Sequence, residues 1–384
     1  MVAGARLNRR GFCAALALGG LLAARQAEAA LAETALTVTD MAGRVVSLPA
    51  PPRRIILLEA RDILSMSVLH ADPAALVVGW AATERIDSAV LQARMQRGRR
   101  IDTVGQMTAD SISREKIAAL SPDLVVANLF MAPEGARDPL VQWLEHNGIP
   151  VVFSDASSNA PDAGAGSGRD LRAYLRMWGE LLGVQAKADD YAAFVDRRLA
   201  EVRHRLVGAA PVTTYLEIQS TVDDCCWAAG NRIWGDLLAR AGGRTLPAVT
   251  APWFQKLHLE YLISTPHEAY IASGGGWAAG GRPAIAPGLD PDAARKALAR
   301  LAGRTGFDQM ASVRNGRVHA IWTGLIGVPP LNVLFVEVAA KWLHPQRCRD
   351  LDPAATLSQI NDRFLSQPID GPLWISLHEK EGTP

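Results

Sequence analysis

Short apolar runs alternate with segments of helical periodicity through the first part of the chain. Four runs have the length of buried strands, and they lie at residues 55–58, 76–78, 125–127 and 151–153. A helical stretch at 62–69 separates the first two, and the turn-forming pair Asn147-Gly148 introduces the fourth. Because apolar strands separated by helices form parallel sheets covered on both faces, this part is predicted to be an α/β layer. A small hairpin with strands at 36–40 and 45–48 precedes it.

The middle of the chain has helical patterning and no strand pattern. Residues 171–182 place apolar side chains at helical spacing, and Gly183 interrupts the pattern. Residues 186–206 continue with an apolar stripe at i, i+3, i+4 and i+7. At ~1.5 Å per residue this second helix is about 30 Å long, which is enough to span a domain.

A second alternating series follows the helices. Its predicted strands lie at 214–218, 269–272 and 318–322, and its predicted helices at 234–241, 291–301 and 333–343. We therefore predict an α/β fold of two Rossmann-like lobes, with mainly parallel sheets, joined by one long backbone helix. The expected boundaries are 30–166 for the N-terminal lobe, 167–208 for a helical linker that includes the backbone helix, and 209–384 for the C-terminal lobe.

Residues 1–29 have the pattern of an export signal. A basic region ends at Arg10, an apolar run covers 12–24, and Ala27-Glu28-Ala29 provides the small-x-small pattern of a cleavage site. Cleavage is expected near Ala29 or Ala30, which places the mature chain in the periplasm. The pair Arg9-Arg10 resembles a twin-arginine signal, and ordinary secretion is the alternative.

Composition and charge exclude several classes of protein. The 384 residues are 49% hydrophobic and 21% charged, which argues against extended disorder. The net charge is +1, so a nucleic-acid binder is not expected. Beyond the N-terminus no apolar run approaches the ~18–20 residues of a membrane-spanning helix. Four cysteines are too few for a disulfide scaffold of this length.

The sequence lacks the common catalytic and metal-binding motifs. It contains no phosphate loop, no His-Glu-x-x-His, no Cys-x-x-Cys and no Gly-x-Ser-x-Gly. We therefore expect a binding protein without catalysis, resident cofactor or resident metal site. The alternative from another class is an exported α/β enzyme that acquires a cofactor before export. A binding protein for bare zinc or manganese is a third hypothesis, although no set of three or four converging ligands is found.

Ligands of open α/β sheets bind beyond the carboxyl ends of the strands. Four of the ten tryptophans, at positions 80, 227, 277 and 322, are predicted to fall in loops at those positions, and arginines accompany them. Aromatic side chains suit a bulky ligand, and arginine suits its anionic oxygens. The candidate ligand-binding residues are Arg61, Trp80, Arg85, Phe130, Cys226, Trp227, Trp253, Trp277, Arg282 and Trp322.

The adjacent cysteines Cys225 and Cys226 admit three interpretations. They could form a disulfide between neighbouring residues, a pair of thiols near the ligand, or an ordinary core position. The neighbouring Asp223 and Asp224 make metal ligation conceivable, but a soft-metal site needs more ligands than the sequence places nearby.

Two segments, one in each predicted lobe, resemble each other. Residues 115–126 read EKIAALSPDLVV, a helix that stops before proline and leads into a strand. Residues 260–271 read EYLISTPHEAYI and repeat the pattern with one residue fewer between Glu and Pro. The similarity indicates that the lobes are related.

Taken together, the segments TVTDMAGRVVSLPAPPRRIILL, EKIAALSPDLVVA, NGIPVVF, ASVRNGRVHAIW and AAKWLHPQRCRDLDP resemble the periplasmic binding proteins that serve ABC importers of ferric siderophores, haem and cobalamin. The match covers nearly all of the mature chain. It implies two lobes bridged by a rigid helix, with the ligand in the cleft between them.

The resemblance also implies a ligand and a protein partner. The expected ligand is an iron(III) chelate of siderophore type, with haem or cobalamin as alternatives. The expected partner is the permease of an ABC importer, which one glutamate on each lobe contacts. Glu115 and Glu260 match those positions. Nothing in the sequence indicates a nucleic-acid partner, and the protein is expected to be a monomer.

Overall fold

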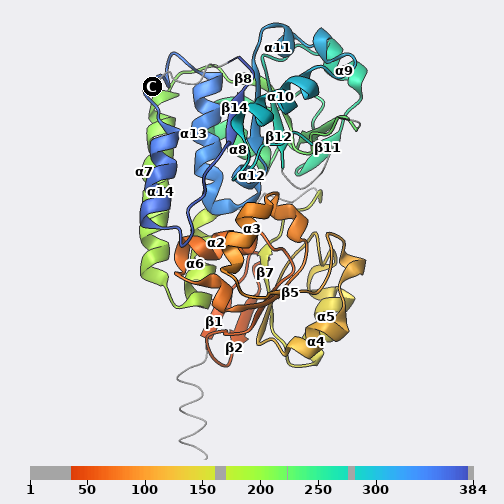
Figure 1. Cartoon of the computed structure of the whole chain (residues 1–384), viewed down its shortest axis with the longest axis vertical. Coiled ribbons are helices and arrows are strands. Elements are labelled where there is room, and N and C mark those ends of the chain that lie inside the picture. The colour runs from red at the N-terminus through yellow and green to blue at the C-terminus, as the bar shows by residue number, and fades with distance from the viewer. Residues whose placement is uncertain (1–35, 161–169, 223, 276–281, 379–384) are drawn as a thin grey trace, which may run out of the picture.

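Two α/β lobes and a helical edge make up the molecule (Figure 1). The computed structural model describes residues 36–160, 170–222, 224–275 and 282–378. The predicted export signal and Trp277 lie outside the described residues. Among the helices of the described ranges, none combines the length and the apolar character needed to cross a bilayer.

The N-terminal lobe is built on a five-stranded parallel sheet with the order β5-β4-β3-β6-β7. Its strands are β3 (Ile55–Leu57), β4 (Val77–Trp80), β5 (Asp102–Thr103), β6 (Leu124–Asn128) and β7 (Val151–Asp155). Its helices are α2 (Asp62–Leu69), α3 (Ala89–Gln96), α4 (Arg114–Leu120) and α5 (Pro139–His146). The antiparallel hairpin of β1 (Leu36–Thr39) and β2 (Val45–Leu48) packs beside them, as predicted.

Both faces of this sheet are buried, which explains the continuous apolar runs. Ile55 and Leu57 point into the core that α2 covers, whereas Ile56 and Leu58 point into a second core with Ile117 of α4. Successive strand residues face opposite sides of a sheet, so a strand covered on both sides needs apolar residues at every position.

The C-terminal lobe has a seven-stranded mixed sheet. The path is β11-β9-β8-β12-β13-β14, and β10 pairs with β8. The strands are β8 (Val212–Glu217), β9 (Trp227–Ala229), β10 (Gly243–Arg244), β11 (Phe254–Lys256), β12 (Ala269–Gly274), β13 (Val318–Trp322) and β14 (Trp374–Ser376). The helices are α8 (Trp234–Arg240), α9 (Leu259–Ser264), α10 (Pro291–Ala302), α11 (Ala311–Arg314), α12 (Gly324–Gly327), α13 (Asn332–Leu343) and α14 (Pro353–Arg363). The predicted strands β8, β12 and β13 form its parallel centre, and the antiparallel strands β9, β11 and β14 were not predicted.

The predicted backbone helix is present. Helix α6 (Leu171–Leu182) ends at Gly183, whose left-handed φ of 67° only glycine adopts without strain. Helix α7 (Gln185–Arg205) then runs for 21 residues along one edge of the molecule beside both lobes (Figure 1). It is fixed to the C-terminal lobe by the Arg198 guanidinium, which donates to the fully buried Glu337 carboxylate at 2.7 Å. Such a rod limits how far the lobes can move apart.

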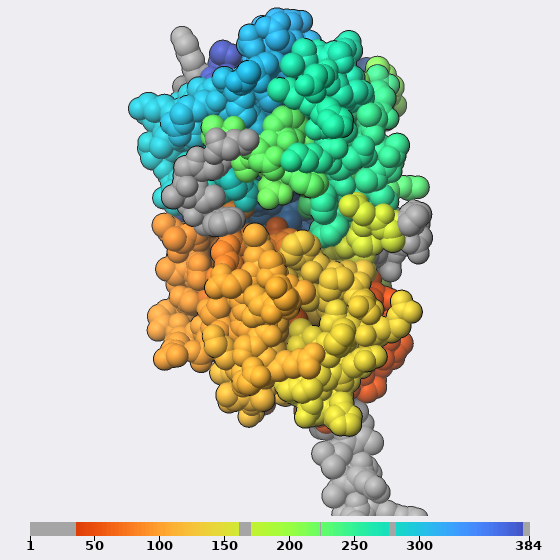
Figure 2. All heavy atoms as spheres, turned by 90° about the vertical axis from the view of Figure 1, so that its right-hand side faces the viewer, coloured from red at the N-terminus to blue at the C-terminus, as the bar shows by residue number. Residues whose placement is uncertain are grey.

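On the side away from α7 the lobes meet directly, with a narrow recess between them (Figure 2). Three consecutive residues of the N-terminal lobe bind the other lobe, and we call this contact the seam. The backbone carbonyl of Ile86 accepts a bond from the Trp322 indole at 3.3 Å. The Asp87 carboxylate pairs with Arg282, and the Ser88 hydroxyl donates to the carbonyl of Pro287 at 2.8 Å.

Candidate ligand-binding cleft

Two adjoining cavities lie between the lobes at the carboxyl ends of β3, β6 and β7. The larger has a volume of about 360 Å³. Residues from both lobes line the two cavities, and the residues common to both are Arg61, Arg85, Phe130, Trp234, Trp253 and Gly327. The position agrees with the rule that ligands bind beyond the carboxyl ends of parallel strands.

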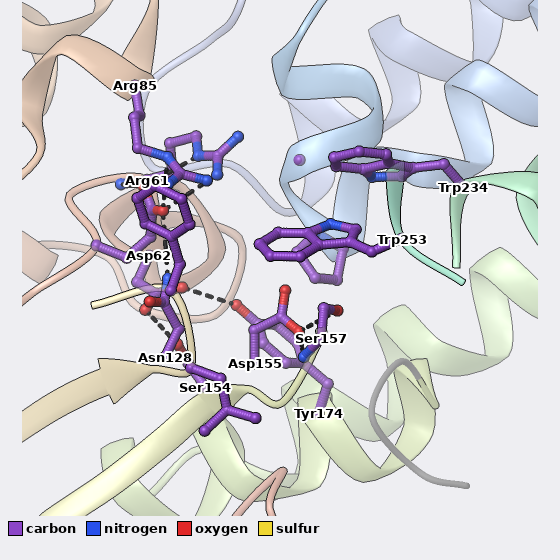
Figure 3. A pocket seen from close by; sticks show the side chains of 15 residues that line it. Arg61, Asp62, Arg85, Asn128, Ser154, Asp155, Ser157, Tyr174, Trp234 and Trp253 are labelled. Carbon is purple, nitrogen blue, oxygen red and sulfur yellow. Dashed lines mark hydrogen bonds and ion pairs between the residues drawn. The ribbon is translucent and has the colours of Figure 1, made fainter. Parts of the chain in front are cut away.

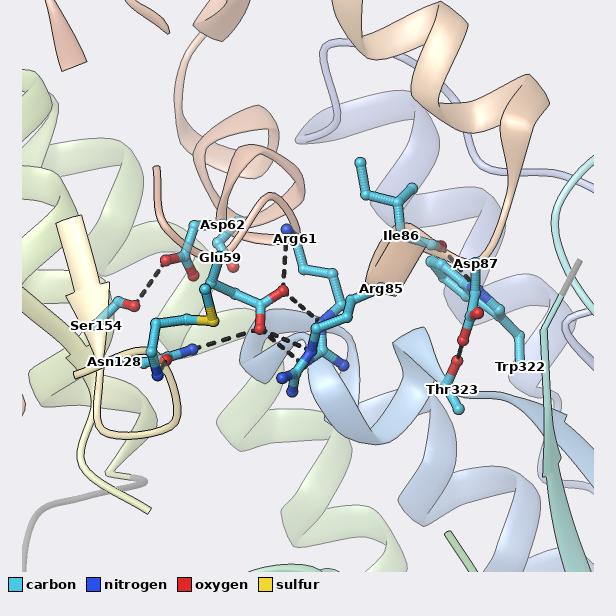
Figure 4. Close-up of polar contacts among 12 residues, drawn as sticks. Glu59, Arg61, Asp62, Arg85, Ile86, Asp87, Asn128, Ser154, Trp322 and Thr323 are labelled. Atoms are coloured by element: carbon cyan, nitrogen blue, oxygen red, sulfur yellow. Dashed lines mark hydrogen bonds and ion pairs between the residues drawn. The ribbon is translucent and has the colours of Figure 1, made fainter. Parts of the chain in front are cut away.

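A buried ion-pair cluster forms the N-terminal side of the cleft (Figure 4). Glu59 follows β3 by two residues, and its carboxylate accepts from Arg61 at 3.0 and 3.1 Å. Arg85 contacts the same carboxylate at 3.0 Å, and the Asn128 amide donates to it at 3.3 Å. Burial alone would raise the pKa of Glu59, but the two guanidinium groups outweigh it and lower the pKa. The cluster Glu59–Arg61–Arg85 therefore carries a net positive charge.

Arg85 is the most exposed of these charges to a cleft ligand. Its guanidinium lies 4.6 Å from the centre of the Phe130 ring, a cation–π contact at the cavity wall. Burial and the neighbouring Arg61 charge lower the pKa of Arg85 to about 10, so the side chain stays protonated at neutral pH. The cleft thus presents a fixed cation beside an aromatic face.

Aromatic rings close the opposite side (Figure 3). The ring of Trp253 lies 6.0 Å from Trp234 and 6.1 Å from Phe130. Phe130 belongs to the N-terminal lobe and both tryptophans to the C-terminal lobe, so the aromatic contact crosses the cleft. The two tryptophans offer apolar surface opposite the charged cluster, and Phe130 adds apolar surface next to Arg85.

The seam forms one wall of the larger cavity. Asp87, Arg282 and Thr323 line it, and they also hold the lobes together. The Asp87 carboxylate contacts Arg282 at 3.4 Å and accepts a bond from the Thr323 hydroxyl. Burial raises the pKa of Asp87, although the Arg282 charge opposes the rise. The side chains that line this wall of the cavity therefore also hold the two lobes together.

Comparisons with known proteins agree with this architecture. A family model described as "Periplasmic binding protein" matches residues 68–321. The chain belongs to this family. No curated protein matches the chain significantly.

Solved structures have the same fold at low sequence identity. A TroA-like periplasmic binding protein, FepB from Veillonella parvula, is 20% identical with a TM-score of 0.73, over 89% of this chain and 100% of the other. The molybdate-binding MolA of a Haemophilus influenzae ABC transporter is 17% identical with a TM-score of 0.67, over 87% and 99%. A protein of an ABC-type Fe3+-hydroxamate transport system from Saccharomonospora viridis is 22% identical with a TM-score of 0.58, over 80% and 99%.

Five of the predicted ligand-binding residues of this periplasmic binding protein meet at the cavities. They are Arg61, Arg85, Phe130, Trp253 and Arg282. They come from segments far apart in the sequence. The position after predicted strands grouped four of them without knowledge of the sheet order, and Trp253 was named from the turn at 251–254.

The other four predicted residues within the described ranges, Trp80, Trp322, Trp227 and Cys226, do not line the two cavities. Trp80 and Trp322 are the last residues of β4 and β13, not loop residues, and both indoles are fully buried. Trp80 packs in the core of its lobe, whereas Trp322 lies in the seam. Trp227 stacks beneath the Lys256 ammonium, 5.4 Å from it. Cys226 is buried and bonded to Cys225.

The acidic side of the cleft was missed. Glu59, Asp62 and Asp87 line the cavities although carboxylates are poor ligands for an anion. Glu59 lies two residues before Arg61 and Asp62 directly follows it, and this proximity was the available signal. Only the fold shows that Arg61 and Arg85 both pair with Glu59. Trp234 was also missed, because it begins the predicted helix 234–241 and does not follow a predicted strand.

Glu115 and Glu260 occupy matching places on the two lobes. Each is the second residue of a short helix, α4 or α9, and each is exposed. The strands that follow, β6 and β12, pair in parallel with β3 and β8, the first sheet strand of each lobe. Hydrogen bonds from the backbone and from the Ser113 hydroxyl lower the pKa of Glu115.

Asp62 is expected to make the stability of the protein depend on pH. Burial raises the pKa of Asp62 to about 7, although its Ser154 hydrogen bond of 2.6 Å opposes the rise. Between about pH 4 and 7 the folded protein keeps a proton that the unfolded chain has lost. The free energy of unfolding therefore falls as pH rises through that window, by up to about 1.4 kcal/mol per pH unit from this group.

An Asp62→Asn variant is expected to lack this component. Denaturant unfolding of both proteins at pH 5, 6, 7 and 8 measures the difference. The variant gains stability relative to the parent as pH rises, whereas the exposed Asp110→Asn control runs parallel to the parent. Parallel curves for Asp62→Asn would show that Asp62 is already ionised at pH 5.

Proposed function

We propose that this periplasmic binding protein captures an iron(III) chelate of siderophore type in the interlobe cleft and delivers it to the permease of an ABC importer. The observation that carries the proposal is the pairing of guanidinium groups with aromatic rings around one interlobe cavity. Arg61, Arg85 and Arg282 supply cations, and Phe130, Trp234 and Trp253 supply apolar faces.

This lining matches the chemistry of a ferric chelate. The metal-binding oxygens of a siderophore carry negative charge and sit on an organic frame with apolar edges. Guanidinium groups donate to such oxygens in a planar, paired geometry. Because the excess cation of the Glu59 cluster lies in a partly water-excluded cleft, its attraction for an anion is stronger than at an open surface.

Cavity size favours a compact chelate over haem or cobalamin. The volume of about 360 Å³ is at the lower end of the ~300–1,000 Å³ typical of small-ligand sites. Among the described lining residues there is no histidine, the most common axial ligand for a haem iron. The Fe3+-hydroxamate transport system from Saccharomonospora viridis has the same fold, which supports an iron chelate as the first ligand to test.

Delivery rests on the paired glutamates. Glu115 and Glu260 project from equivalent helices of the two lobes, so a permease with two matching cationic sites can contact both lobes at once. The MolA relative belongs to an ABC transporter, in agreement with a permease as the partner.

The ligand test is a titration of the mature protein with ferric hydroxamate, ferric catecholate, haem and cobalamin. A bound chelate lies beside Trp253 and Trp234 and is expected to quench their fluorescence. At a free concentration ~100 times its dissociation constant it also stabilises the fold by about 2.7 kcal/mol, measured as a rise in Tm. If none of the ferric chelates changes fluorescence or Tm while haem or cobalamin does, the chelate assignment is wrong.

A further inference from the structure

A group of potential metal ligands lies at the carboxyl end of β8, outside the cavity lining. One oxygen of Glu217 and the sulfurs of Cys225 and Cys226 all lie within 4.8 Å of one another. Cys226 is fully buried and Cys225 half-buried, and the two sulfurs are bonded to each other. Glu217 supplies the third ligand that the sequence did not show near the cysteines.

The surroundings of Glu217 are closed and neutral in charge. Its carboxylate is fully buried and accepts from the Arg304 guanidinium at 2.7 and 3.2 Å. The Tyr270 hydroxyl donates to it at 2.5 Å. With the cysteines oxidised, the single negative charge of Glu217 is balanced by Arg304. Any added cation must therefore bring its own compensating anions.

A second buried tyrosine borders the same carboxylate. Tyr215 lies two residues before Glu217 on the same face of β8, and its ring stacks on Tyr270 with 5.2 Å between centres.

We propose that the reduced pair Cys225 and Cys226, together with Glu217, forms a binding site for a thiophilic divalent cation such as zinc. Reduction by a dithiol transfers two electrons and two protons to the disulfide, giving two thiols and leaving the reductant as a disulfide. The cation then replaces the two thiol protons, which are released to solvent. Two thiolates balance its two positive charges, so the cluster stays neutral with Glu217 paired to Arg304.

The ligand spacing suits such a cation. Zinc lies ~2.3 Å from thiolate sulfur and ~2.0–2.2 Å from carboxylate oxygen, so the ligand atoms of a tetrahedral site are roughly 3.5 Å apart. The observed limit of 4.8 Å is compatible with this value once the sulfur–sulfur bond is opened. Soft thiolate ligands favour zinc or cadmium over magnesium or calcium.

The site is linked to the cleft but does not depend on the proposed ligand. Arg304 also donates to the carbonyl of Thr221 at 2.7 Å, and Thr221 lines the larger cavity. Arg304 therefore contacts both Glu217 and a residue of the cavity wall. Binding of a chelate in the cleft and binding of a cation at the cysteines can be measured separately.

The test compares oxidised and reduced forms of one protein. A Cys348→Ala background removes the only other cysteine among the described residues. One half of the preparation is oxidised, the other is reduced with a phosphine that is then removed, and both are titrated with zinc or cadmium chloride without oxygen. We expect one equivalent of cation per reduced chain, with two protons released and a thiolate–cadmium absorption band, and no binding by the oxidised chain.

A Cys225→Ser variant in the reduced form is expected to bind at least 100-fold more weakly, and Glu217→Gln tests the third ligand. The Glu217→Gln substitution removes the carboxylate that pairs with Arg304, so the Tm of this variant is measured as a check that it is folded. The comparison of oxidised with reduced protein does not depend on this variant. Equal binding by oxidised and reduced protein, no binding by reduced protein, or full affinity in Cys225→Ser each overturns the proposal. A failure here leaves the chelate titration of the cleft unaffected.

Discussion

Replacement of Arg85 by alanine is expected to weaken binding of the ferric chelate roughly 100-fold, or about 2.7 kcal/mol. Arg85 lines both cavities, and its guanidinium also faces the Phe130 ring at 4.6 Å. Its loss removes one charge-assisted contact and turns the net positive cluster into a neutral Glu59–Arg61 pair. Fluorescence titration or calorimetry with the chelate measures the change.

A second substitution distinguishes the effect of the cluster's net charge on affinity from the effect of the direct contact that Arg85 makes with the ligand. Changing Glu59 to glutamine in the Arg85→Ala protein restores the net positive charge of the cluster without restoring the lost donor. Partial recovery of chelate affinity is expected if the net positive charge of the cluster attracts the chelate. The exposed Arg100→Ala change in the same lobe serves as the control and leaves affinity unchanged. Unaltered chelate affinity in Arg85→Ala, with the protein folded, would contradict the assigned site.

Reversing both docking charges, as Glu115→Arg with Glu260→Arg, is expected to abolish uptake while ligand affinity stays within twofold of the parent. Both side chains are exposed, and neither lines a cavity. Arginine at these places repels a cationic permease surface instead of attracting it. Transport of radiolabelled iron chelate into cells that carry the cognate importer measures uptake, and titration of the purified protein measures binding.

The matched control for the double variant reverses two other exposed carboxylates, Glu134 and Asp308, one in each lobe. It carries the same change in net charge, so a general electrostatic effect on uptake would affect both proteins equally. Equal uptake by the two double variants would contradict a specific role for Glu115 and Glu260. Loss of ligand binding in the docking variant would show instead that the glutamates support the fold of the cleft.

The fold could be predicted where strands are buried on both faces or helices are long. β3 and β13 stand out because every residue is apolar or buried, and α7 because its apolar stripe persists for five turns. β9 and β11 could not be found in this way. Each has three residues, and β11 (Phe254–Lys256) is not fully buried at any position, so it shows neither a continuous apolar run nor clear alternation.

The site was predictable in its cations and less so in its carboxylates and tryptophans. Arg61 and Arg85 follow strands closely, and chain position alone takes them to the cleft. Trp80 and Trp322 end their strands, where a difference of one residue decides whether an indole lies in the sheet or beyond it. Glu59 belongs to the site because it pairs with Arg61 and Arg85, which lie 2 and 26 positions further along the chain. That pairing depends on the order of β3 and β4 in the sheet.

The seam has a consequence for how a ligand is held. Arg282 contacts Asp87 across the lobes and also lines the larger cavity. Under the proposed function, an anionic chelate and the Asp87 carboxylate therefore compete for one guanidinium. An anion that displaces Asp87 from Arg282 breaks one ion pair between the lobes, and the bound anion then contacts both lobes itself. Binding of the chelate and the ion pair between the lobes thus depend on the same Arg282 guanidinium. A chelate with weaker negative charge leaves the Asp87–Arg282 ion pair in place.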